Sequence, residues 1–317
     1  MKATATAHPN IALIKYWGKR DLPLNLPDVP SLSVTLDTFT TTTTVTWGTG
    51  ASADQIVVNG EEAAGEAAAR VSRFLDLVAP QRPAVSVVTD NNFPTAAGLA
   101  SSASGFAALA LAANRAAGVE RSLTELSVLA RRGSGSACRS LWGGWVLWQR
   151  GEREDGTDSH GEPIAPQDHW DVNIVLALVS SAKKPIGSTA GMLKTKQQSP
   201  LYPGWISSAD ADIAQARDAL ARRDLPALGE AMERSTLKMH ATMISAGVRY
   251  WKPETVAVME RVEALRRSGV AAYYTMDAGP NVKILCEGKD SATVEAALRE
   301  QGAETRVLGV GGDATVR

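Results

Sequence analysis

The segment NNFPTAAGLASSASG (Asn91–Gly105) joins a valine-rich strand expected at residues 84–89 to a small-residue helix expected at 102–117. Small side chains let backbone N–H groups approach an anion, and a helix N-terminus carries a partial positive charge. Ser101 and Ser102 can cap this helix or bind a phosphate and its magnesium. The same composition fits a capped helix packed closely on a sheet, and it matches neither GxxxxGK[ST] nor GxGxxG. The segment alone leaves both interpretations open.

Strand and helix patterns alternate on both sides of this segment. The periodicity of apolar residues and the turn residues predict an α+β protein with a boundary near residues 180–187. We expect further strands at 31–36, 40–47, 55–59, 142–148, 171–179, 271–276, 282–286 and 304–308. We expect further helices at 61–78, 123–131, 208–222, 225–239, 253–268 and 291–300. The charged stretch 150–169 contains Gly and Pro and is predicted to form an exposed loop.

Composition indicates a globular enzyme that acts on a small molecule. The chain has 317 residues, 44% of them hydrophobic, and a formal net charge of −1. No global field therefore favours nucleic acid or acidic lipid, and an anionic ligand needs a local cluster of donors. Cys138 and Cys286 lie far apart without metal-ligand spacing, which favours reduced thiols. We expect no signal peptide, no membrane span and a cytoplasmic location.

A lysine interrupts the apolar segment NIALIKYWGK near the N-terminus. On a strand, Lys15 shares a face with Ile11 and Leu13. A lysine on an apolar face is costly unless an anion accompanies it. Lys15 is therefore either a residue that snorkels from a strand end or a cation directed into a ligand cleft.

Two further segments carry charged side chains beside glycines. In RRGSGSACRS, Arg139 lies one helical turn after Ser136, so both can reach one carboxylate or phosphate. A turn with a short helix and a surface arginine is the alternative. In TMDAGPN, Asp277 can form an Asx-type turn, or it can orient or deprotonate a substrate hydroxyl.

Four long segments together resemble one enzyme family. They are NIALIKYWGKRD, NNFPTAAGLASSASGFAALA, RRGSGSACRSLWGG and YYTMDAGPNVK, with further similar segments at Lys183–Met192 and Lys238–Thr242. They occur in the same order in the diphosphomevalonate decarboxylases, a branch of the GHMP small-molecule kinase superfamily. The similarity runs from near the N-terminus to about residue 285.

The resemblance implies both a fold and a reaction. The fold is a ribosomal S5-like half, expected at 1–183, and a ferredoxin-like α/β half, expected at 184–317, with the active site between them. The family uses MgATP to phosphorylate the 3-hydroxyl of mevalonate 5-diphosphate. Phosphate and CO₂ then leave, and isopentenyl diphosphate remains. Relatives also imply a homodimer.

The resemblance assigns roles by motif position. Asp277 matches the catalytic aspartate that faces the 3-hydroxyl, and Lys15 matches the lysine that neutralises the transferring phosphate. Arg139 matches the arginine that binds the C1 carboxylate, with Ser136 and Asn10 assisting.

Further positions match the diphosphate and nucleotide sites. Residues that match positions facing the diphosphate tail are Tyr16, Lys19 and Ser134. The implied ATP-binding residues are Asn92, Gly98, Leu99, Ala100, Ser101 and Ser102. Ser102 also matches the serine near the γ-phosphate and magnesium. The metal is expected to arrive with the nucleotide, since no dedicated cage is visible.

Two departures from the family pattern keep alternatives open. His8 replaces a residue of the usual APxN segment, and Ala246–Trp251 stands where relatives often have a Pro-Pro pair. The second departure leaves the substrate length open, so the alternatives are a mevalonate 5-phosphate decarboxylase or a mevalonate-type kinase without decarboxylation. A non-catalytic sensor would be expected to lack one of the charged residues Asp277, Lys15 or Arg139, and none is missing.

Overall fold

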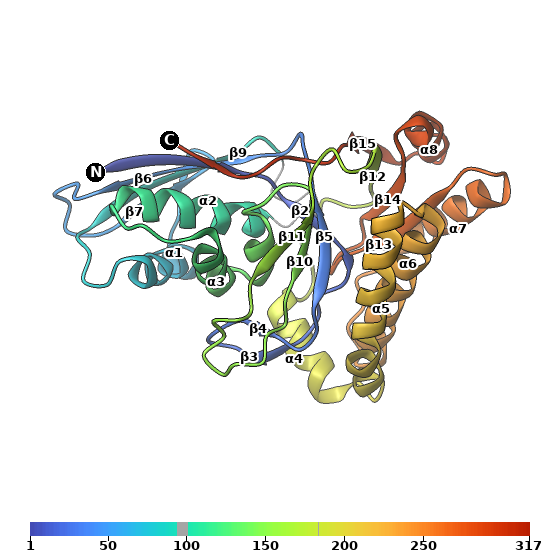
Figure 1. The fold of residues 1–317 in the computed structure, drawn as a ribbon, viewed down its shortest axis with the longest axis horizontal. Coiled ribbons are helices and arrows are strands. Elements are labelled where there is room, and N and C mark those ends of the chain that lie inside the picture. The colour runs from blue at the N-terminus through green and yellow to red at the C-terminus, as the bar shows by residue number, and fades with distance from the viewer. Residues whose placement is uncertain (94–100, 183) are drawn as a thin grey trace.

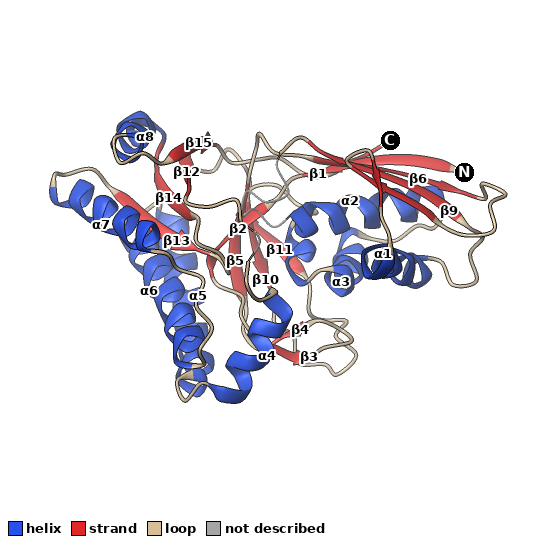
Figure 2. Cartoon of the chain, turned by 180° about the vertical axis from the view of Figure 1, so that it is seen from behind, coloured by secondary structure: helices blue, strands red, loops and turns tan. Residues whose placement is uncertain are grey.

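The computed structural model describes residues 1–93, 101–182 and 184–317, and it is an α+β structure, as expected (Figure 1). Within these residues the strands form one six-stranded sheet, two four-stranded sheets and one two-stranded sheet. The helices gather in two groups, one beneath the six-stranded sheet and one at the opposite end of the molecule (Figure 2).

The six-stranded sheet has the order β16-β1-β6-β9-β7-β8. Its strands are β1 (Lys2–Ala7), β6 (Thr41–Trp47), β7 (Gln55–Val58), β8 (Glu61–Glu62), β9 (Val85–Asn91) and β16 (Thr315–Val316). Helices α1 (Gly65–Val78), α2 (Ser101–Ala116) and α3 (Leu123–Gly133) lie on one side of it (Figure 1). The alanines of α2 and those of β1 are buried against each other, because small side chains permit close approach.

A four-stranded sheet of order β11-β10-β5-β2 occupies the middle of the molecule. Its strands are β2 (Asn10–Ile14), β5 (Ser31–Thr35), β10 (Trp145–Trp148) and β11 (Gly161–Ala165). All five residues of β2 are buried. Near it lie the small sheet of β3 (Lys19–Asp21) and β4 (Leu26–Pro27), and the 3₁₀ turn η1 (Gly135–Arg139).

The third large sheet has the order β13-β14-β12-β15 and belongs mainly to the C-terminal half. Its strands are β12 (Val172–Leu178), β13 (Ala272–Met276), β14 (Val282–Glu287) and β15 (Glu304–Leu308). The accompanying helices are α4 (Ser188–Gln198), α5 (Tyr202–Arg222), α6 (Leu225–Ser245), α7 (Pro253–Arg267) and α8 (Ser291–Arg299), with the 3₁₀ turn η2 (Gly288–Asp290) before α8.

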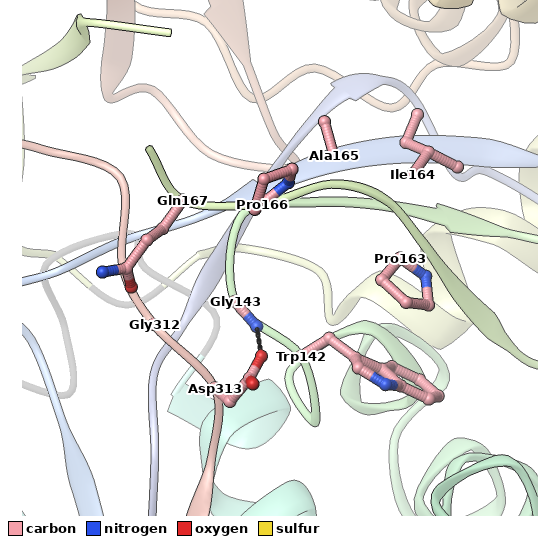
Figure 3. Close-up of a pocket in the computed structure, with 9 residues that line it drawn as sticks. All are labelled: Trp142, Gly143, Pro163, Ile164, Ala165, Pro166, Gln167, Gly312 and Asp313. Carbon is pink, nitrogen blue, oxygen red and sulfur yellow. Dashed lines mark hydrogen bonds between the residues drawn. The ribbon is translucent and has the colours of Figure 1, made fainter. Parts of the chain in front are cut away.

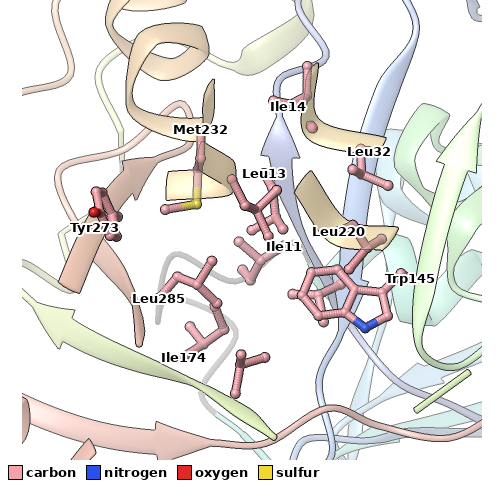
Figure 4. Close-up of a cluster of buried hydrophobic side chains, with 14 of the residues drawn as sticks. Ile11, Leu13, Ile14, Leu32, Trp145, Ile174, Leu220, Met232, Tyr273 and Leu285 are labelled. Atoms are coloured by element: carbon pink, nitrogen blue, oxygen red, sulfur yellow. The ribbon is translucent and has the colours of Figure 1, made fainter. Parts of the chain in front are cut away.

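One hydrophobic core joins the two halves (Figure 4). Ile11 and Leu13 from β2 meet Leu220 of α5, Met232 of α6 and Leu285 of β14. Each Å² of apolar surface that this core removes from water stabilises the junction by roughly 25 cal/mol. The end of β2 is therefore held firmly against α6 and the C-terminal sheet.

Several expected boundaries were wrong. Residues 61–62 form a strand that pairs with β7, so α1 begins only at Gly65. Residues 161–165, expected in a loop, form an edge strand on β10, where Pro163 and Glu162 are tolerated. Strand β10 starts at Trp145, since Gly144 has a φ of +66°.

Other elements were not predicted or were predicted too short. Strands β1 and β16 and helix α4 are additions, α5 begins at Tyr202, and α6 extends to Ser245. In contrast, the capping box of Ser122 and Glu125 before α3 is confirmed. No helix in the described part of the chain is long and apolar enough to cross a membrane. The division at residues 183/184 stays a prediction.

Candidate active site

The central feature of the site is an ion pair between the two halves of the chain. Lys15 follows the last residue of β2, and Asp277 follows the last residue of β13. The Lys15 ammonium lies 2.7 Å from Asp277 Oδ1. The backbone N–H of Lys15 donates to the hydroxyl of Ser235 on α6, 3.0 Å away. The core that fixes β2 against α6 therefore also fixes Lys15 beside Asp277.

A second lysine approaches the same carboxylate from β14. The Lys283 ammonium lies 2.9 Å from Asp277 Oδ2. Both lysine side chains are only 1% exposed, whereas the Asp277 side chain is 34% exposed. We call Lys15, Asp277 and Lys283 the charge cluster. Asp277 is thus the member of the charge cluster that a ligand can reach.

Burial and charge act on the cluster in opposite directions. Burial lowers the pKa of Lys15 to about 8, although the Asp277 carboxylate favours its charged form. Burial alone would raise the pKa of Asp277, but Lys15 and Lys283 outweigh it and hold that pKa well below its usual range. Asp277 is therefore ionised at neutral pH and is a weak proton acceptor.

Arg139 is a buried cation held by neutral groups. Its Nε and Nη2 donate to Asn10 Oδ1 at 3.2 and 3.0 Å, and its Nη1 donates to the Ser31 hydroxyl at 2.6 Å. The guanidinium carbon lies 5.6 Å from the centre of the Trp148 ring. The side chain is 2% exposed, and no described acidic residue forms a salt bridge with it. A buried cation of this kind favours an anionic ligand such as a carboxylate.

The Asn10 amide connects Arg139 to the turn before it. Asn10 Nδ2 donates to the backbone oxygen of Ser136 at 3.1 Å and to the Ser140 hydroxyl at 2.7 Å. Asn10 thus uses its oxygen to orient Arg139 and its nitrogen to hold η1. The structure therefore brings Asn10 to Arg139 and to the backbone of Ser136, and their shared role in binding a carboxylate stays a prediction.

Tyr16 and Lys19 lie on the segment after β2. The Tyr16 ring packs on Trp148 with 4.6 Å between ring centres, and burial raises the pKa of its hydroxyl, which has no hydrogen-bond partner among the described residues. Lys19 Nζ donates to Asn25 Oδ1 at 2.5 Å, and burial lowers the pKa of Lys19 to about 8. The Tyr16 hydroxyl and the Lys19 ammonium can therefore both form further hydrogen bonds with a ligand.

The start of α2 lies beside the end of α3. The hydroxyls of Ser102 and Ser134 are 3.1 Å apart, so the phosphate helix meets the segment that leads into η1. Ser101 is the first residue of α2. Gly98, Leu99 and Ala100 fall outside the described residues.

Asn92 has a different environment from the one we expected of a nucleotide ligand. Its Nδ2 donates to the backbone oxygen of Thr38 at 3.0 Å, and its Oδ1 accepts from the N–H of Thr40 at 2.8 Å. The oxygen and the nitrogen of the Asn92 side-chain amide are thus both used to connect β9 with the segment before β6. ATP binding by Asn92 stays a prediction.

Sequence reasoning missed Lys283 and Ser31. Lys283 shares a face of β14 with the buried Leu285, so it shows the same signal that identified Lys15, a lysine on an apolar face of a strand. Ser31 begins β5 and had no signal, because a serine on a strand is common and its contact with Arg139 spans distant segments.

A separate hollow of about 470 Å³ lies beside β11 and the segment before β16 (Figure 3). Its described lining consists of Trp142, Gly143, Pro163, Ile164, Ala165, Pro166, Gln167, Gly312 and Asp313. The Gly143 N–H donates to Asp313 Oδ1 at 2.8 Å, which ties the C-terminal segment to this wall (Figure 3). The charge cluster and Arg139 are not part of this lining, so the hollow is not the candidate site.

Comparisons with known proteins match most of the chain. Residues 7–161 match the diphosphomevalonate decarboxylase-like N-terminal domain, and residues 174–307 match the mevalonate 5-diphosphate decarboxylase C-terminal domain. The human diphosphomevalonate decarboxylase is 40% identical over 93% of this chain and 79% of its own length. The chain belongs to the diphosphomevalonate decarboxylase family.

Solved structures of the family share the whole fold. The mevalonate diphosphate decarboxylase from Staphylococcus aureus has a TM-score of 0.95 and 38% identity, covering 100% of this chain and 98% of its own. A complex described as MDDEF with MVAPP, AMPPCP and magnesium has a TM-score of 0.94 and 40% identity, covering 100% and 99%. The chain is therefore an ATP-dependent decarboxylase of the mevalonate pathway, acting on mevalonate 5-diphosphate.

Proposed function

We propose that the chain converts mevalonate 5-diphosphate and MgATP to isopentenyl diphosphate, ADP, phosphate and CO₂ at the charge cluster. The observation that carries this proposal is the position of Asp277, whose reachable carboxylate lies between two buried ammonium groups. The guanidinium of Arg139 is close enough to interact electrostatically with both Lys15 and Asp277. A reacting hydroxyl and a carboxylate of one small substrate can therefore be held at the same time.

The first step is phosphoryl transfer to the 3-hydroxyl. The hydroxyl oxygen forms a bond to the γ-phosphorus of ATP, ADP leaves with the electron pair, and Asp277 orients the hydroxyl and receives its proton. Because Asp277 is a weak base, its main contribution is orientation, while the Lys15 ammonium offsets the charge of the transferring phosphoryl group.

The second step breaks two bonds. Phosphate leaves C3 with the electron pair of the C3–O bond, so positive charge develops at C3. The C1–C2 bond then supplies the electrons of the C2=C3 double bond, and CO₂ departs. Arg139 holds the C1 carboxylate through its free donors, and Tyr16, Lys19 and Ser134 face the diphosphate.

Magnesium is expected with the nucleotide, where it neutralises part of the triphosphate charge. The Ser102 hydroxyl is a hard oxygen ligand that suits this ion, while the helix N-terminus beside it suits the phosphate groups that carry the ion. The described residues contain no group of three or more His, Cys, Asp or Glu that could hold a metal by itself. The residues thus fit an ion whose remaining ligands are phosphate oxygens and water.

One assay tests the proposed reaction directly. The protein is incubated with MgATP and mevalonate, its 5-phosphate or its 5-diphosphate, and ADP and CO₂ are measured together. We expect equal amounts of both products from the diphosphate. ADP without CO₂ would indicate a kinase, and a preference for the monophosphate would revise the substrate.

We further propose that the protein acts as a homodimer in the cytoplasm. The support is the family resemblance and the absence of a membrane-spanning helix in the described residues. Light scattering after size exclusion should give twice the chain mass of 33.5 kDa. A monomer of full activity would contradict the dimer.

A further inference from the structure

Lys283 is buried where the strand pattern favours an apolar residue. It is the second residue of β14, and its neighbours Val282 and Ile284 are fully buried. Taking an ammonium group out of water is costly, and such groups are kept where a specific partner or function requires them. Lys283 therefore needs a reason to be in this strand.

The geometry at Asp277 supplies that reason. Lys15 from β2 contacts Oδ1 at 2.7 Å, and Lys283 from β14 contacts Oδ2 at 2.9 Å. A carboxylate held at one oxygen can still turn about its Cβ–Cγ bond. When both oxygens are held from different strands, rotation breaks at least one charge-assisted contact. The two lysines together fix the plane of the carboxylate.

We propose that Lys283 is a positioning residue for the reaction, which fixes the Asp277 carboxylate so that its exposed side meets the substrate 3-hydroxyl. This inference rests on the proposed role of Asp277 and adds a second residue to it. Lys283 acts through Asp277 and need not touch the substrate. Its removal should therefore slow turnover more than it weakens binding.

Other charged or titratable groups near Asp277 must be considered in a pH test. Lys15 comes from β2, Lys184 precedes α4, Arg139 comes from η1, and His240 comes from α6. Burial lowers the pKa of His240 to about 3, so this histidine is neutral in the assay range. The loss of Lys283 would remove one of the two ammonium groups that the described residues place in direct contact with Asp277, while burial continues to raise the pKa of Asp277.

The sign of the pH effect follows from that change. Activity that needs the ionised carboxylate is present above the Asp277 pKa and lost as the pH falls through it. In the wild type this pKa lies well below the usual range, so no acid limb should appear above about pH 4. Without Lys283 the acid limb of kcat should move to higher pH.

The main test compares Lys283→Met with two matched variants, using mevalonate 5-diphosphate and MgATP. We expect Lys283→Met to lower kcat by about 10- to 100-fold, with both KM values changed less than about threefold. Lys283→Arg should recover part of kcat, because it restores a cation beside Oδ2. The control Lys289→Met removes an exposed lysine just after β14 and should leave kcat unchanged.

Three outcomes would overturn the inference. An unchanged kcat and pH profile in Lys283→Met would show that the lysine is only structural. A raised KM with unchanged kcat would show that it binds a ligand instead. A kcat for Asp277→Asn/Lys283→Met tenfold below that of Asp277→Asn would show that Lys283 acts independently of Asp277.

Folding and the dependence on Asp277 are controlled separately. Thermal unfolding is measured for each variant, and if the Met variant does not fold, Lys283→Gln is judged by the same criteria, with Lys283→Arg still expected to recover part of kcat. Normal turnover in Asp277→Asn would refute the proposed role of Asp277. Loss of turnover in Asp277→Asn with normal Lys283→Met would refute only the inference about Lys283.

Discussion

The charge cluster and the start of α2 prepare for their ligands in different ways. In the cluster, the ammonium groups of Lys15 and Lys283 each lie within 3 Å of the Asp277 carboxylate, so ionised groups are fixed before any ligand binds. At the start of α2, Ser102 and Ser134 offer neutral hydroxyls and a helix N-terminus. One region supplies preorganised charge, and the other supplies donors for charge that arrives with the nucleotide.

This difference indicates which of the two regions contributes more to the rate of the reaction. Groups that are already oriented need no reorganisation when charge develops in the transition state, so they contribute most to the rate. Neutral hydroxyls can be replaced in part by water or by neighbouring donors. We therefore expect substitutions in the charge cluster to have larger effects than those at α2.

Asp277→Asn should have the largest effect on kcat. A smaller effect than that of Ser102→Ala would contradict the contrast between the charge cluster and the start of α2. Asp277→Asn keeps the shape of the side chain but removes the charge between the two lysines, and we expect kcat to fall by about 10²- to 10⁴-fold. ATP binding, measured by calorimetry with a non-hydrolysable analogue, should be nearly unchanged. Asp210→Asn on the exposed side of α5 is the control.

Arg139→Ala should have the next largest effect. It removes the buried guanidinium and leaves Asn10 and Ser31 without their partner, so we expect kcat/KM for the diphosphate substrate to fall about 100-fold. Steady-state kinetics measure this change, and thermal unfolding separates it from lost stability. Arg267→Ala, at an exposed position, serves for comparison. Unchanged KM and kcat would mean that the carboxylate binds elsewhere.

Ser102→Ala tests the hydroxyl side of the comparison. It removes one donor beside Ser134 and the nucleotide, and we expect kcat to fall about tenfold, the value of one lost hydrogen bond. ADP release under saturating substrates measures it, with the exposed Ser207→Ala as control. Wild-type kinetics would show that Ser102 has no role in the reaction. A loss of kcat as large as that of Asp277→Asn would contradict the contrast between the charge cluster and the start of α2.

The smallest effect, about twofold at pH 8, is expected from the titration of Lys15. Burial lowers the pKa of Lys15 to about 8, so the ammonium that offsets phosphoryl charge is present below that value and lost as the pH rises through it. We expect kcat/KM to fall toward tenfold per pH unit above about pH 8. A bound anion will raise this pKa, so the limb of kcat should lie at higher pH than that of kcat/KM. A flat profile to pH 10 would contradict the assignment.

Much of the site could be predicted because its residues contradict their local pattern. Lys15 on an apolar strand and Arg139 among glycines were visible as exceptions, and their grouping with Asp277 came from the family resemblance. Lys283 is the same kind of exception but was not predicted, because it lies two residues after the turn Asp277–Asn281, where a lysine at a strand end is common. Ser31 could not be found, since its only distinction is a contact with a residue more than one hundred positions away.

The fold was predictable where periodicity is strong and local. Strand β6 follows from a run of β-branched threonines, and helix α3 follows from a capping box. Strand β1 was missed although Ala3, Ala5 and Ala7 alternate, because alanine has little strand preference. Strands β11 and β16 have no local signal, and they exist because partner strands offer unpaired backbone groups.

The pairing of β16 with β1 has a consequence for biosynthesis. The chain starts the six-stranded sheet with β1, continues it with β6, β7, β8 and β9, and adds the last strand, beside β1, only at residues 315–316, so both ends lie side by side (Figure 1). During translation, the edge of β1 remains open until nearly all of this sequence has left the ribosome. A nascent chain stalled before that point would expose a strand edge able to pair with other chains, so a chaperone should bind it most strongly there.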